Sequence, residues 1–243
     1  MRITPCSECS LRKLECFSKA TSDEISFIQS YKKTEIKLSA GKTLVHQGSR
    51  NVELYTLKSG WAFRYSLLEN GKRQILNFIL PGDFIGLQAE LDKELNYGIE
   101  SLTECVFCVF PQDRIMDVYS QYPTLGYDLT WLAAHGELIV DENLISVGGR
   151  NALQRIAMLL VSLYKRASSI GEVVDESFNF PITQQHIADS MGLSLVHTNK
   201  TMAKLKLYGV QEITNNRIKI RSLDKIARLA EYYSLPLRNR PLL

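Results

Sequence analysis

The sequence contains no apolar run long enough to cross a membrane, and its first residues lack the apolar stretch of a secretory signal peptide. We therefore expect no membrane partner and a cytoplasmic location. Neither sign of charge dominates, since 29 Lys and Arg stand against 26 Asp and Glu. With 45% hydrophobic and 23% charged residues, the 243 residues have an ordinary globular composition and suffice for two domains with their own cores.

Cysteine and histidine are also scarce. The five cysteines are an odd number with three near the start, unlike the disulfide framework of a secreted domain. The four histidines are scattered, and no Ser, His and Asp set or carboxylate pair indicates catalysis. Cys6 and Cys9 have the spacing of a redox motif, but they lie in an N-terminal leader and not beside a βαβ pattern. The sequence therefore predicts no enzyme, and a thiol or iron–sulfur redox enzyme is the alternative.

Positive charge is concentrated in the last part of the chain. Residues 182–243 contain ten Lys and Arg against four Asp and Glu, a net charge of +6, so the remainder of this +3 chain carries −3. A basic segment on an otherwise acidic chain is what contact with nucleic-acid phosphates requires.

Residues 183–206, TQQHIADSMGLSLVHTNKTMAKLK, predict two short helices joined by a tight turn. Ala188 is small enough for close approach of the two helices, and Gly192 supplies the positive φ that the turn needs. Thr183 and Ser194 can cap the two helix starts. This combination is typical of a helix-turn-helix that enters DNA. The alternative is an ordinary helical hairpin with a solvated face.

The second of these helices is predicted to expose a polar face that reads DNA. Val196 would contact a thymine methyl group, Asn199 adenine and Lys200 guanine. Lys200 could instead bind a phosphate, and His197 either reaches a phosphate or base or is simply solvated. The apolar side of the helix is formed by Leu195, Met202 and Leu205. The predicted DNA-contacting residues are Thr183, Gln184, Ser194, Val196, His197, Asn199, Lys200, Lys204 and Arg217.

Residues 34–110 alternate short apolar runs with turn signals, which predicts a small antiparallel β-barrel or roll rather than βαβ units. Asn70-Gly71 is a two-residue hairpin signal, and Pro81-Gly82-Asp83 marks another turn. The predicted core of the roll contains Leu44, Leu54, Tyr55, Leu57, Trp61, Phe63, Ile75, Phe78 and Ile79.

Residues 123–147 are predicted to form one long helix with an apolar seam at spacings of three and four residues. Such a seam predicts a dimer interface, and the alternative is a helix that packs on its own barrel. The seam consists of Trp131, Ala134, Leu138, Asp141 and Ile145, widened by Leu129, Leu132 and Ile139.

The remaining elements complete a predicted α+β chain. A helix is expected at residues 150–167, a β-hairpin wing over ITNNRIKIRS, and a short helix at 224–233. The predicted domains are the cysteine-bearing leader 1–20, the β-roll 21–122, the dimerisation helix 123–147, the winged helix-turn-helix domain 148–233 and a loose tail 234–243.

The order of β-roll, long helix and winged helix-turn-helix resembles the CRP/FNR superfamily of bacterial transcription regulators. LYTLKSGWAFRY, RQILNFILPGDFIGLQ and ITQQHIADSMGLSLVHTNKTMAKLK carry the resemblance, which covers nearly the whole chain. It implies a cyclic-nucleotide-binding-like sensor roll, a homodimer, and an inverted-repeat operator in double-stranded DNA with half-sites about one helical turn apart. An activator of this family would also contact RNA polymerase.

Cyclic AMP is not the expected ligand. Family members that bind cyclic nucleotides carry Gly-Glu-Leu after the Pro-Gly-Asp turn, and later an Arg followed by a small hydroxyl residue. Here the corresponding positions read Gly86-Leu87-Gln88 and Asn96-Tyr97-Gly98, so both the ribose-binding carboxylate and the phosphate-binding Arg are missing. The chain therefore resembles the FNR-like members more closely.

The FNR-like branch senses oxygen through an iron–sulfur cluster held by N-terminal cysteines and one cysteine on the roll. By resemblance, Cys6, Cys9, Cys16 and Cys108 are the candidate ligands of a [4Fe–4S] cluster. Cys105 lies three residues before Cys108 and should point to the opposite face of the strand. Six residues separate Cys9 from Cys16 where FNR has five, and Cys16, Cys105 and Cys108 could instead be buried apolar residues. A zinc site has less support, because no nearby histidine completes a familiar pattern. The alternative is a regulator of the same fold that lacks a cluster or responds to a cyclic nucleotide or another small ligand.

The dimer helix resembles that of FNR, whereas the reading helix departs from it. Gly136-Glu137-Leu138, Asp141 and Ile145 resemble the FNR dimer helix, and two Asp141 carboxylates near a two-fold axis would repel each other. On the reading helix, Val196, Asn199 and Lys200 stand where FNR has Glu, Ser and Arg. The operator is therefore expected to differ from those of FNR and CRP.

Overall fold

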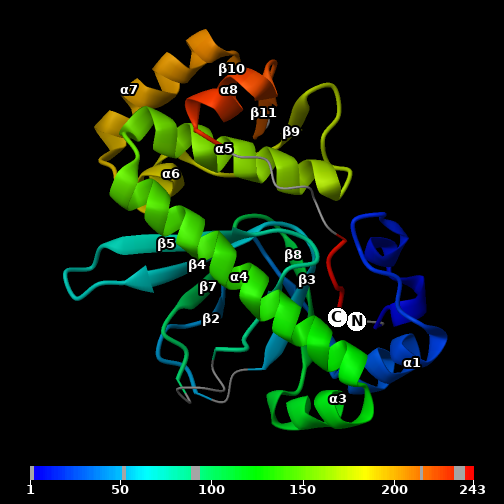
Figure 1. Ribbon diagram of the computed structural model, residues 1–243. Coiled ribbons are helices and arrows are strands. Elements are labelled where there is room, and N and C mark those ends of the chain that lie inside the picture. Colours follow the sequence, from blue (N-terminus) through cyan, green and yellow to red (C-terminus); the bar gives the residue numbers. More distant parts are fainter. Residues whose placement is uncertain (1–2, 51–52, 89–93, 214–215, 233–238) are drawn as a thin grey trace. The chain divides into compact units, whose positions relative to one another are not determined.

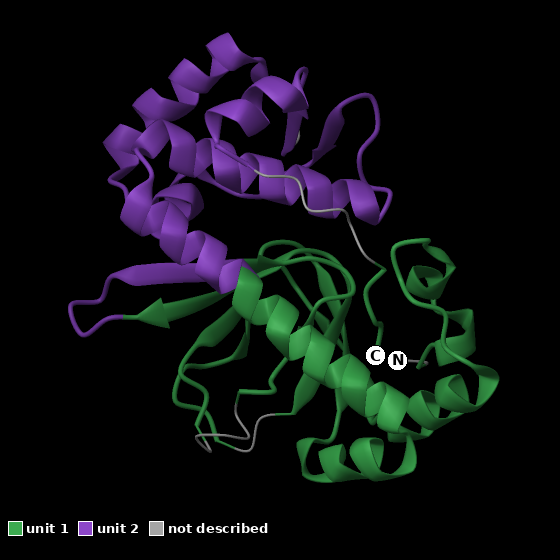
Figure 2. Cartoon of the chain, viewed as in Figure 1, with its two compact units in different colours: residues 1–67, 78–138, 238–243 green, residues 68–77, 139–237 purple. Residues whose placement is uncertain are grey.

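The computed structural model describes residues 3–50, 53–88, 94–213, 216–232 and 239–243 (Figure 1). The chain divides into two compact units (Figure 2). The roll unit comprises residues 1–67, 78–138 and 238–243, and the HTH unit comprises residues 68–77 and 139–237. The architecture is the predicted α+β fold. Within the described ranges, no helix is long and apolar enough to span a membrane.

The roll unit is built on short antiparallel strands in two sheets. Alternate side chains of these strands point inward and form an apolar core. The predicted core residues are buried except Leu44, which is half-buried while Val45 beside it is buried. The first sheet has the order β1 (Thr34–Leu38), β8 (Cys105–Phe110), β3 (Leu54–Ser59) and β6 (Phe84–Ile85). The second has the order β2 (Thr43–Val45), β7 (Gly98–Ser101), β4 (Ala62–Leu67) and β5 (Arg73–Ile79).

The two predicted turns of the roll sequence are confirmed. Gly71 adopts φ +77°, and its N–H donates to the Leu68 carbonyl at 2.8 Å. Gly82 adopts φ +88°, and the N–H of Asp83 donates to the Leu80 carbonyl at 3.0 Å. Glycine is needed at both places because side chains rarely tolerate this backbone conformation.

Short helices at both ends of the roll were not predicted. They are η1 (Cys6–Glu8), η2 (Ser10–Lys13), α1 (Ser22–Tyr31), η3 (Gln112–Arg114) and α3 (Ile115–Gln121). The start of α1 does carry a local signal, a capping box in which Thr21 and Glu24 satisfy each other's backbone N–H groups. Phe27, Ile28 and Tyr31 of α1 join a buried cluster with residues of β8 and of the long helix.

The long helix α4 (Pro123–Gly149) runs two residues beyond the predicted end. Leu129 and Leu132 are buried in the cluster that contains Phe27 and Phe110. The prediction that Leu129 and Leu132 widen the exposed seam is therefore wrong, because both side chains face the core of the roll unit.

The HTH unit contains a winged helix-turn-helix. Its wing is a three-stranded sheet of order β10-β11-β9. The hairpin of β10 and β11 was predicted from the sequence, and the edge strand β9 was not. Its elements are α5 (Ala152–Ser169), β9 (Ser177–Asn179), α6 (Gln184–Met191), α7 (Leu195–Leu205), η4 (Lys206–Tyr208), β10 (Val210–Ile213), β11 (Arg217–Ile220) and α8 (Leu223–Leu229).

The expectation of a loose tail is wrong for its described part. Residues 241–243 are buried, and residues 238–243 belong to the roll unit although the preceding stretch belongs to the HTH unit. Residues 234–238 lie outside the described residues. A short Pro-Leu-Leu sequence gives no periodicity by which its docking could be predicted.

Candidate functional site

The local geometry of α6 and α7 follows the sequence signals. Thr183 caps α6 by accepting from the N–H of His186 at 3.2 Å, and Ser194 caps α7 by accepting from the N–H of His197 at 3.2 Å. Gly192 closes α6 in the left-handed conformation, with φ 63° and ψ 38°. Ala188 is 2% exposed. The predicted helix–turn–helix is confirmed (Figure 1).

The inner side of α7 differs from the expectation at one position. Met202 and Leu205 are buried as expected, but Leu195 is 43% exposed. Leu195 stands in the first turn of α7, and burial begins one turn later with Thr198. Thr198 and Thr201 are also buried on this face. Because threonine is polar, these two positions do not stand out in the apolar pattern of the sequence.

The outer side of α7 carries the predicted contact residues. Val196 is 65% exposed, and His197, Asn199, Lys200 and Lys204 are exposed. Two lysines four residues apart on an exposed helix face can donate to phosphate or base acceptors. This exposed set is called the reading face, and it consists of Val196, His197, Asn199, Lys200 and Lys204.

The remaining predicted contact residues are placed less simply. Thr183 is exposed, and Gln184 is half-buried. Arg217 of β11 is half-buried, and its guanidinium donates to the side-chain and backbone oxygens of Ser177 at 3.2 and 3.1 Å. These two bonds tie Arg217 to β9. The sequence reasoning also omitted Lys206, which directly follows α7 and is exposed.

Residues 68–77, the turn after β4 and the first five residues of β5, are grouped with the HTH unit, although β5 also belongs to the second sheet of the roll. The Arg73 Nε lies 3.0 Å from the Asp189 Oδ2 of α6, and Gln74 donates to the Ser190 carbonyl at 3.1 Å. Asn143 of α4 donates to the Leu76 carbonyl at 2.6 Å. These contacts join positions more than sixty residues apart, so no local sequence signal could have found them.

His186 of α6 is a half-buried histidine in the capping box. Its Nδ1 accepts from the Thr183 N–H at 3.2 Å, which requires the neutral imidazole. Burial lowers the pKa of His186 and nearby Arg73 lowers it further, against the opposing effect of Asp189. The first turn of α6 is therefore built for an uncharged histidine.

The free side of α4 contains the predicted dimer residues. Leu138 is 63% exposed and Ile145 is 56% exposed, while Ala134 and Asp141 are also exposed. Trp131 is half-buried and stacks on His135, with ring centroids 4.8 Å apart. The helix thus packs on its own unit with one face and leaves an apolar stripe open on another.

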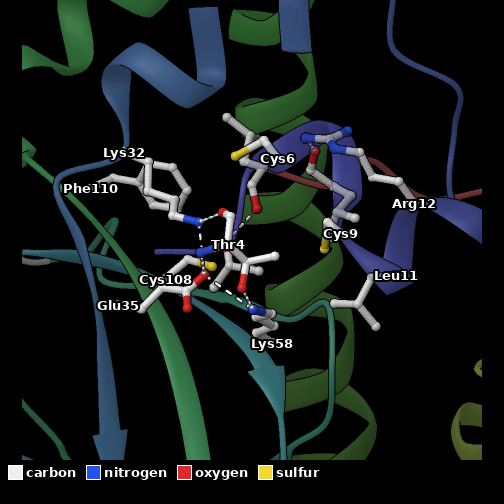
Figure 3. A pocket seen from close by; sticks show the side chains of 13 residues that line it. Thr4, Cys6, Cys9, Leu11, Arg12, Lys32, Glu35, Lys58, Cys108 and Phe110 are labelled. Carbon is white, nitrogen blue, oxygen red and sulfur yellow. Dashed lines mark hydrogen bonds and ion pairs between the residues drawn. The ribbon is translucent and has the colours of Figure 1, made fainter. Parts of the chain in front are cut away.

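Two cysteines of the leader line a hollow in the roll unit together with Cys108 of β8 (Figure 3). Three of the four predicted ligands, Cys6, Cys9 and Cys108, line it, and Cys16 does not. Cys105 lies on the other side of β8 as predicted, where its Sγ contacts the Trp61 carbonyl at 3.2 Å. The residues that line this thiol hollow are Thr4, Cys6, Cys9, Leu11, Arg12, Lys32, Glu35, Thr56, Lys58, Cys108, Phe110, Leu242 and Leu243.

A buried carboxylate holds the cations of the hollow. Glu35 Oε1 accepts from Lys32 Nζ at 2.9 Å, from Lys58 Nζ at 3.2 Å and from the Thr4 N–H at 3.3 Å. Glu35 Oε2 is buried and has no hydrogen-bond partner among the described residues. Burial raises the pKa of Glu35, but the hydrogen bonds from Lys32 and Lys58 outweigh it and bring the pKa below its ordinary value.

Two thiols of the hollow, Cys6 and Cys108, have pKa values raised by burial, which favours their neutral form. Burial raises the pKa of Cys108 to about 11, although Lys32 opposes this, and burial also raises the pKa of Cys6. Across the described ranges, no three His, Cys, Asp or Glu side chains are grouped so that they could hold a metal ion. The hollow therefore gathers three thiols without forming a metal site in this conformation.

Two family domains match this chain. Residues 35–122 match the cyclic nucleotide-binding domain, and residues 154–229 match the Crp-like helix-turn-helix domain. The nitrogen fixation regulation protein FixK of Bradyrhizobium diazoefficiens is 24% identical over 225 residues, 93% of each chain. The fumarate and nitrate reduction regulatory protein of Escherichia coli is 24% identical over 226 residues, which cover 93% of this chain and 90% of the relative.

Solved structures share the fold. FixK2 from Bradyrhizobium japonicum superposes with a TM-score of 0.73 at 20% identity, covering 81% of this chain and 96% of that chain. A CooA mutant from Carboxydothermus hydrogenoformans superposes with a TM-score of 0.68 at 15% identity, covering 94% and 98%.

Proposed function

The chain belongs to the CRP/FNR family of DNA-binding transcription regulators, which are not enzymes, and we propose that it reads an inverted-repeat operator as a homodimer. The exposed reading face of α7 carries this proposal. Each protomer would place one α7 in the major groove, with half-sites about one helical turn apart. Such a regulator would act in the cytoplasm, and it would contact RNA polymerase if it activates transcription.

Base recognition is assigned to three residues of the reading face. Lys200 would donate to guanine, Asn199 would bind adenine, and the exposed Val196 would contact a thymine methyl group. Lys204 would bind a phosphate. No carboxylate stands on this face to accept from cytosine, so the preferred sequence differs from operators that are read by a glutamate.

Selection of binding sites from a random duplex pool by the full chain tests this function. We expect a two-fold symmetric consensus with half-sites about ten base pairs apart, centre to centre. A pool that shows no enrichment, or an enriched site without two-fold symmetry, would contradict the proposal.

The stripe on α4 is the proposed dimer interface. Leu138 and Ile145 are large apolar side chains left open to water, and a second copy of the helix would cover them. Asp141 lies between them and would meet its counterpart near the two-fold axis. Repulsion between the two carboxylates would keep the monomer and the dimer in balance.

We also propose that the signal reaches the roll through the thiols of the hollow. Cys6, Cys9 and Cys108 would supply three ligands of a [4Fe–4S] cluster, and Cys16 of the leader would have to move to supply the fourth. When bound, such a cluster would provide an oxygen-sensitive centre. Lys32 and Lys58 lie at the same hollow and would offset the negative charge of thiolate ligands.

A cluster-free regulator is the second candidate, and it is supported by the arrangement of the described residues, in which no three His, Cys, Asp or Glu side chains are grouped to hold a metal ion. Cyclic AMP still has no evident partner. Arg64 of β4 lies beside two of the positions that depart from the cyclic-nucleotide motif, with its guanidinium carbon 4.5 Å from the centroid of the Tyr97 ring and a bond donated to Gln88 at 3.4 Å. Calorimetry with cyclic AMP and cyclic GMP should therefore detect no binding heat.

The visible spectrum of protein purified without oxygen separates the two candidates. A broad sulfur-to-iron absorption that bleaches in air, and that a Cys108→Ser variant lacks, would support the cluster. Colourless protein without iron or sulfide after anaerobic reconstitution would contradict the cluster and leave the regulator with another input.

A further inference from the structure

We propose that residues 239–243 form a latch that closes the thiol hollow and holds the cysteine-bearing leader on the roll. Residues 139–237 belong to the HTH unit, yet the last stretch of the chain belongs to the roll unit (Figure 2). Leu242 and Leu243 are 6% and 5% exposed.

Arg240 makes the first anchor of the latch. Its backbone forms a parallel bridge with Phe17: the Ser18 N–H donates to the Arg240 carbonyl, and the Arg240 N–H donates to the Cys16 carbonyl, each at 2.9 Å. Its guanidinium lies 2.7 Å from Asp83 Oδ1 and donates to the Pro81 carbonyl at 2.8 Å. Such partly buried, charge-assisted contacts are stronger than exposed ion pairs.

The turn at Gly82 is shaped for this anchor. A Cβ atom at Gly82 would lie 2.3 Å from the Phe17 ring and 3.1 Å from the Arg240 guanidinium. The guanidinium carbon in turn lies 4.8 Å from the centroid of the Phe17 ring. The Phe17 ring of the leader therefore packs against both the turn at Gly82 and the Arg240 side chain of the latch.

Leu242 and Leu243 make the second anchor, at the hollow itself. Arg12 of the leader donates to the Leu242 carbonyl at 3.3 Å, and Thr56 of β3 donates to the Leu243 carbonyl at 2.7 Å. The Leu243 side chain belongs to the same buried cluster as Cys6 and Cys108. Two leucines of the latch thus form part of the lining of the hollow that contains these thiols.

The leader contacts the latch at both anchors, through the backbone bridge to Arg240 and through Arg12, so we expect changes at the thiols and docking of the latch to influence each other. A ligand or modification that moves Cys6 or Cys9 also moves Arg12 and the backbone that pairs with Arg240. By reciprocity, release of the latch changes access to the thiols. All of the described contacts of the latch lie within the roll unit, so docking of the latch does not require DNA binding.

Thiol alkylation of the full chain tests the latch. Iodoacetamide labelling at each cysteine is followed by peptide mass spectrometry in the wild type, in Leu243→Asp and in Arg240→Ala. Leu207→Asp is the matched control, since Leu207 is 87% exposed and lies in η4 of the HTH unit. We expect Cys6 and Cys108 to react about tenfold or more faster in both latch variants, and at the wild-type rate in the control.

Cys105 provides an internal standard in the same molecules. It is fully buried in β8 but does not line the hollow, so its rate should stay unchanged in the latch variants. Equal rates at Cys6 and Cys108 in all four proteins would overturn the proposal. Acceleration of Cys105 to the same degree would also overturn it, because the segment would then be an inseparable part of the roll core.

Hydrogen exchange tests the reverse direction. In wild-type protein whose hollow thiols have been alkylated, the amide protons of Ser18 and Arg240 should exchange faster than in untreated protein, because these amides donate across the latch bridge. Unchanged protection of both amides after complete labelling of Cys6 would contradict the coupling.

Discussion

The reading face of α7 and the thiol hollow differ in how the chain builds them. The reading face comes from one continuous helix, residues 195–205, whereas the hollow draws on the leader, β1, β3, β8 and residues 242–243. The reading face exposes its lysines, while the hollow buries Lys32 and Glu35 with side chains 2% and 1% exposed. Exposed cations are available to an outside partner such as phosphate. Buried cations are committed to partners inside the molecule, and the hollow can therefore respond only when its packing changes.

The largest expected effect is removal of the buried charge of the hollow. In Glu35→Ala, the ammonium group of Lys32 would stay buried without its carboxylate, and we expect a loss of about 3–5 kcal/mol in the free energy of unfolding. Urea unfolding of the variant measures this loss.

The matched control for Glu35 is the exposed pair of Lys37 and Glu104, whose side chains are 52% and 64% exposed and whose closest atoms lie 2.9 Å apart. Glu104→Ala should cost less than about 1 kcal/mol. If the two variants lost similar amounts of unfolding free energy, burial would not make the Glu35 ion pairs more important for stability than an exposed pair.

A smaller effect is expected at α4, which contributes residues to both units. Asp141→Ala should strengthen dimerisation by on the order of 1 kcal/mol, several-fold in the dissociation constant, because it removes like charges from the proposed two-fold axis. Sedimentation equilibrium measures the change. Asp224→Ala, an exposed acidic residue of α8, controls for net charge. If both variants dimerise as the wild type does, the assignment of Asp141 to the interface is wrong.

The smallest expected effect concerns the capping box of α6. The folded chain binds a proton at His186 more weakly than the unfolded chain, because the pKa of His186 is lowered below its ordinary value of 6.5. Its stabilising contribution is therefore complete above pH 6.5 and is lost as the pH falls from there through the lowered pKa. Thermal unfolding between pH 7 and pH 5 should show a steeper loss of stability in the wild type than in His186→Gln.

Glutamine is the informative replacement at His186 because its side chain can still accept from the Thr183 N–H without titrating. The exposed His197 is present in both proteins and cancels in the comparison. Parallel pH profiles for wild type and variant would exclude His186 as the source of the pH dependence.

Features set by neighbours in the sequence could be predicted, and features set by distant packing could not. The caps at Thr183 and Ser194, the turn at Gly192 and the strand core around Trp61 each follow from local chemistry or from a two-residue period. The family resemblance added the order of the domains. In contrast, the helical spacing predicted that Leu195 is buried, and it is exposed. The spacing alone does not show how far along α7 the neighbouring elements cover its inner face.

The same reason explains the larger errors. Cys16 was assigned with Cys6 and Cys9 by family resemblance in spite of its different spacing, and the described leader places only Cys6 and Cys9 at the hollow. Docking of Leu242 and Leu243 depends on Thr56 and Arg12, which lie far away in the chain. The link between Arg73 and Asp189 is equally remote in sequence. Each of these contacts exists only after the fold has brought the partners together.

The affinity of Lys200→Ala for DNA tests the central claim, that the exposed face of α7 reads bases, most directly. Fluorescence anisotropy would compare the full chain and the variant on the selected operator and on a shuffled duplex at one salt concentration. Lys225→Ala, which removes an exposed lysine of α8, is the matched control. We predict a loss of about 1–3 kcal/mol on the operator for Lys200→Ala, with a clearly smaller loss on the shuffled duplex and for the control. Equal losses on both duplexes, or a loss no larger than that of Lys225→Ala, would contradict base reading by this face.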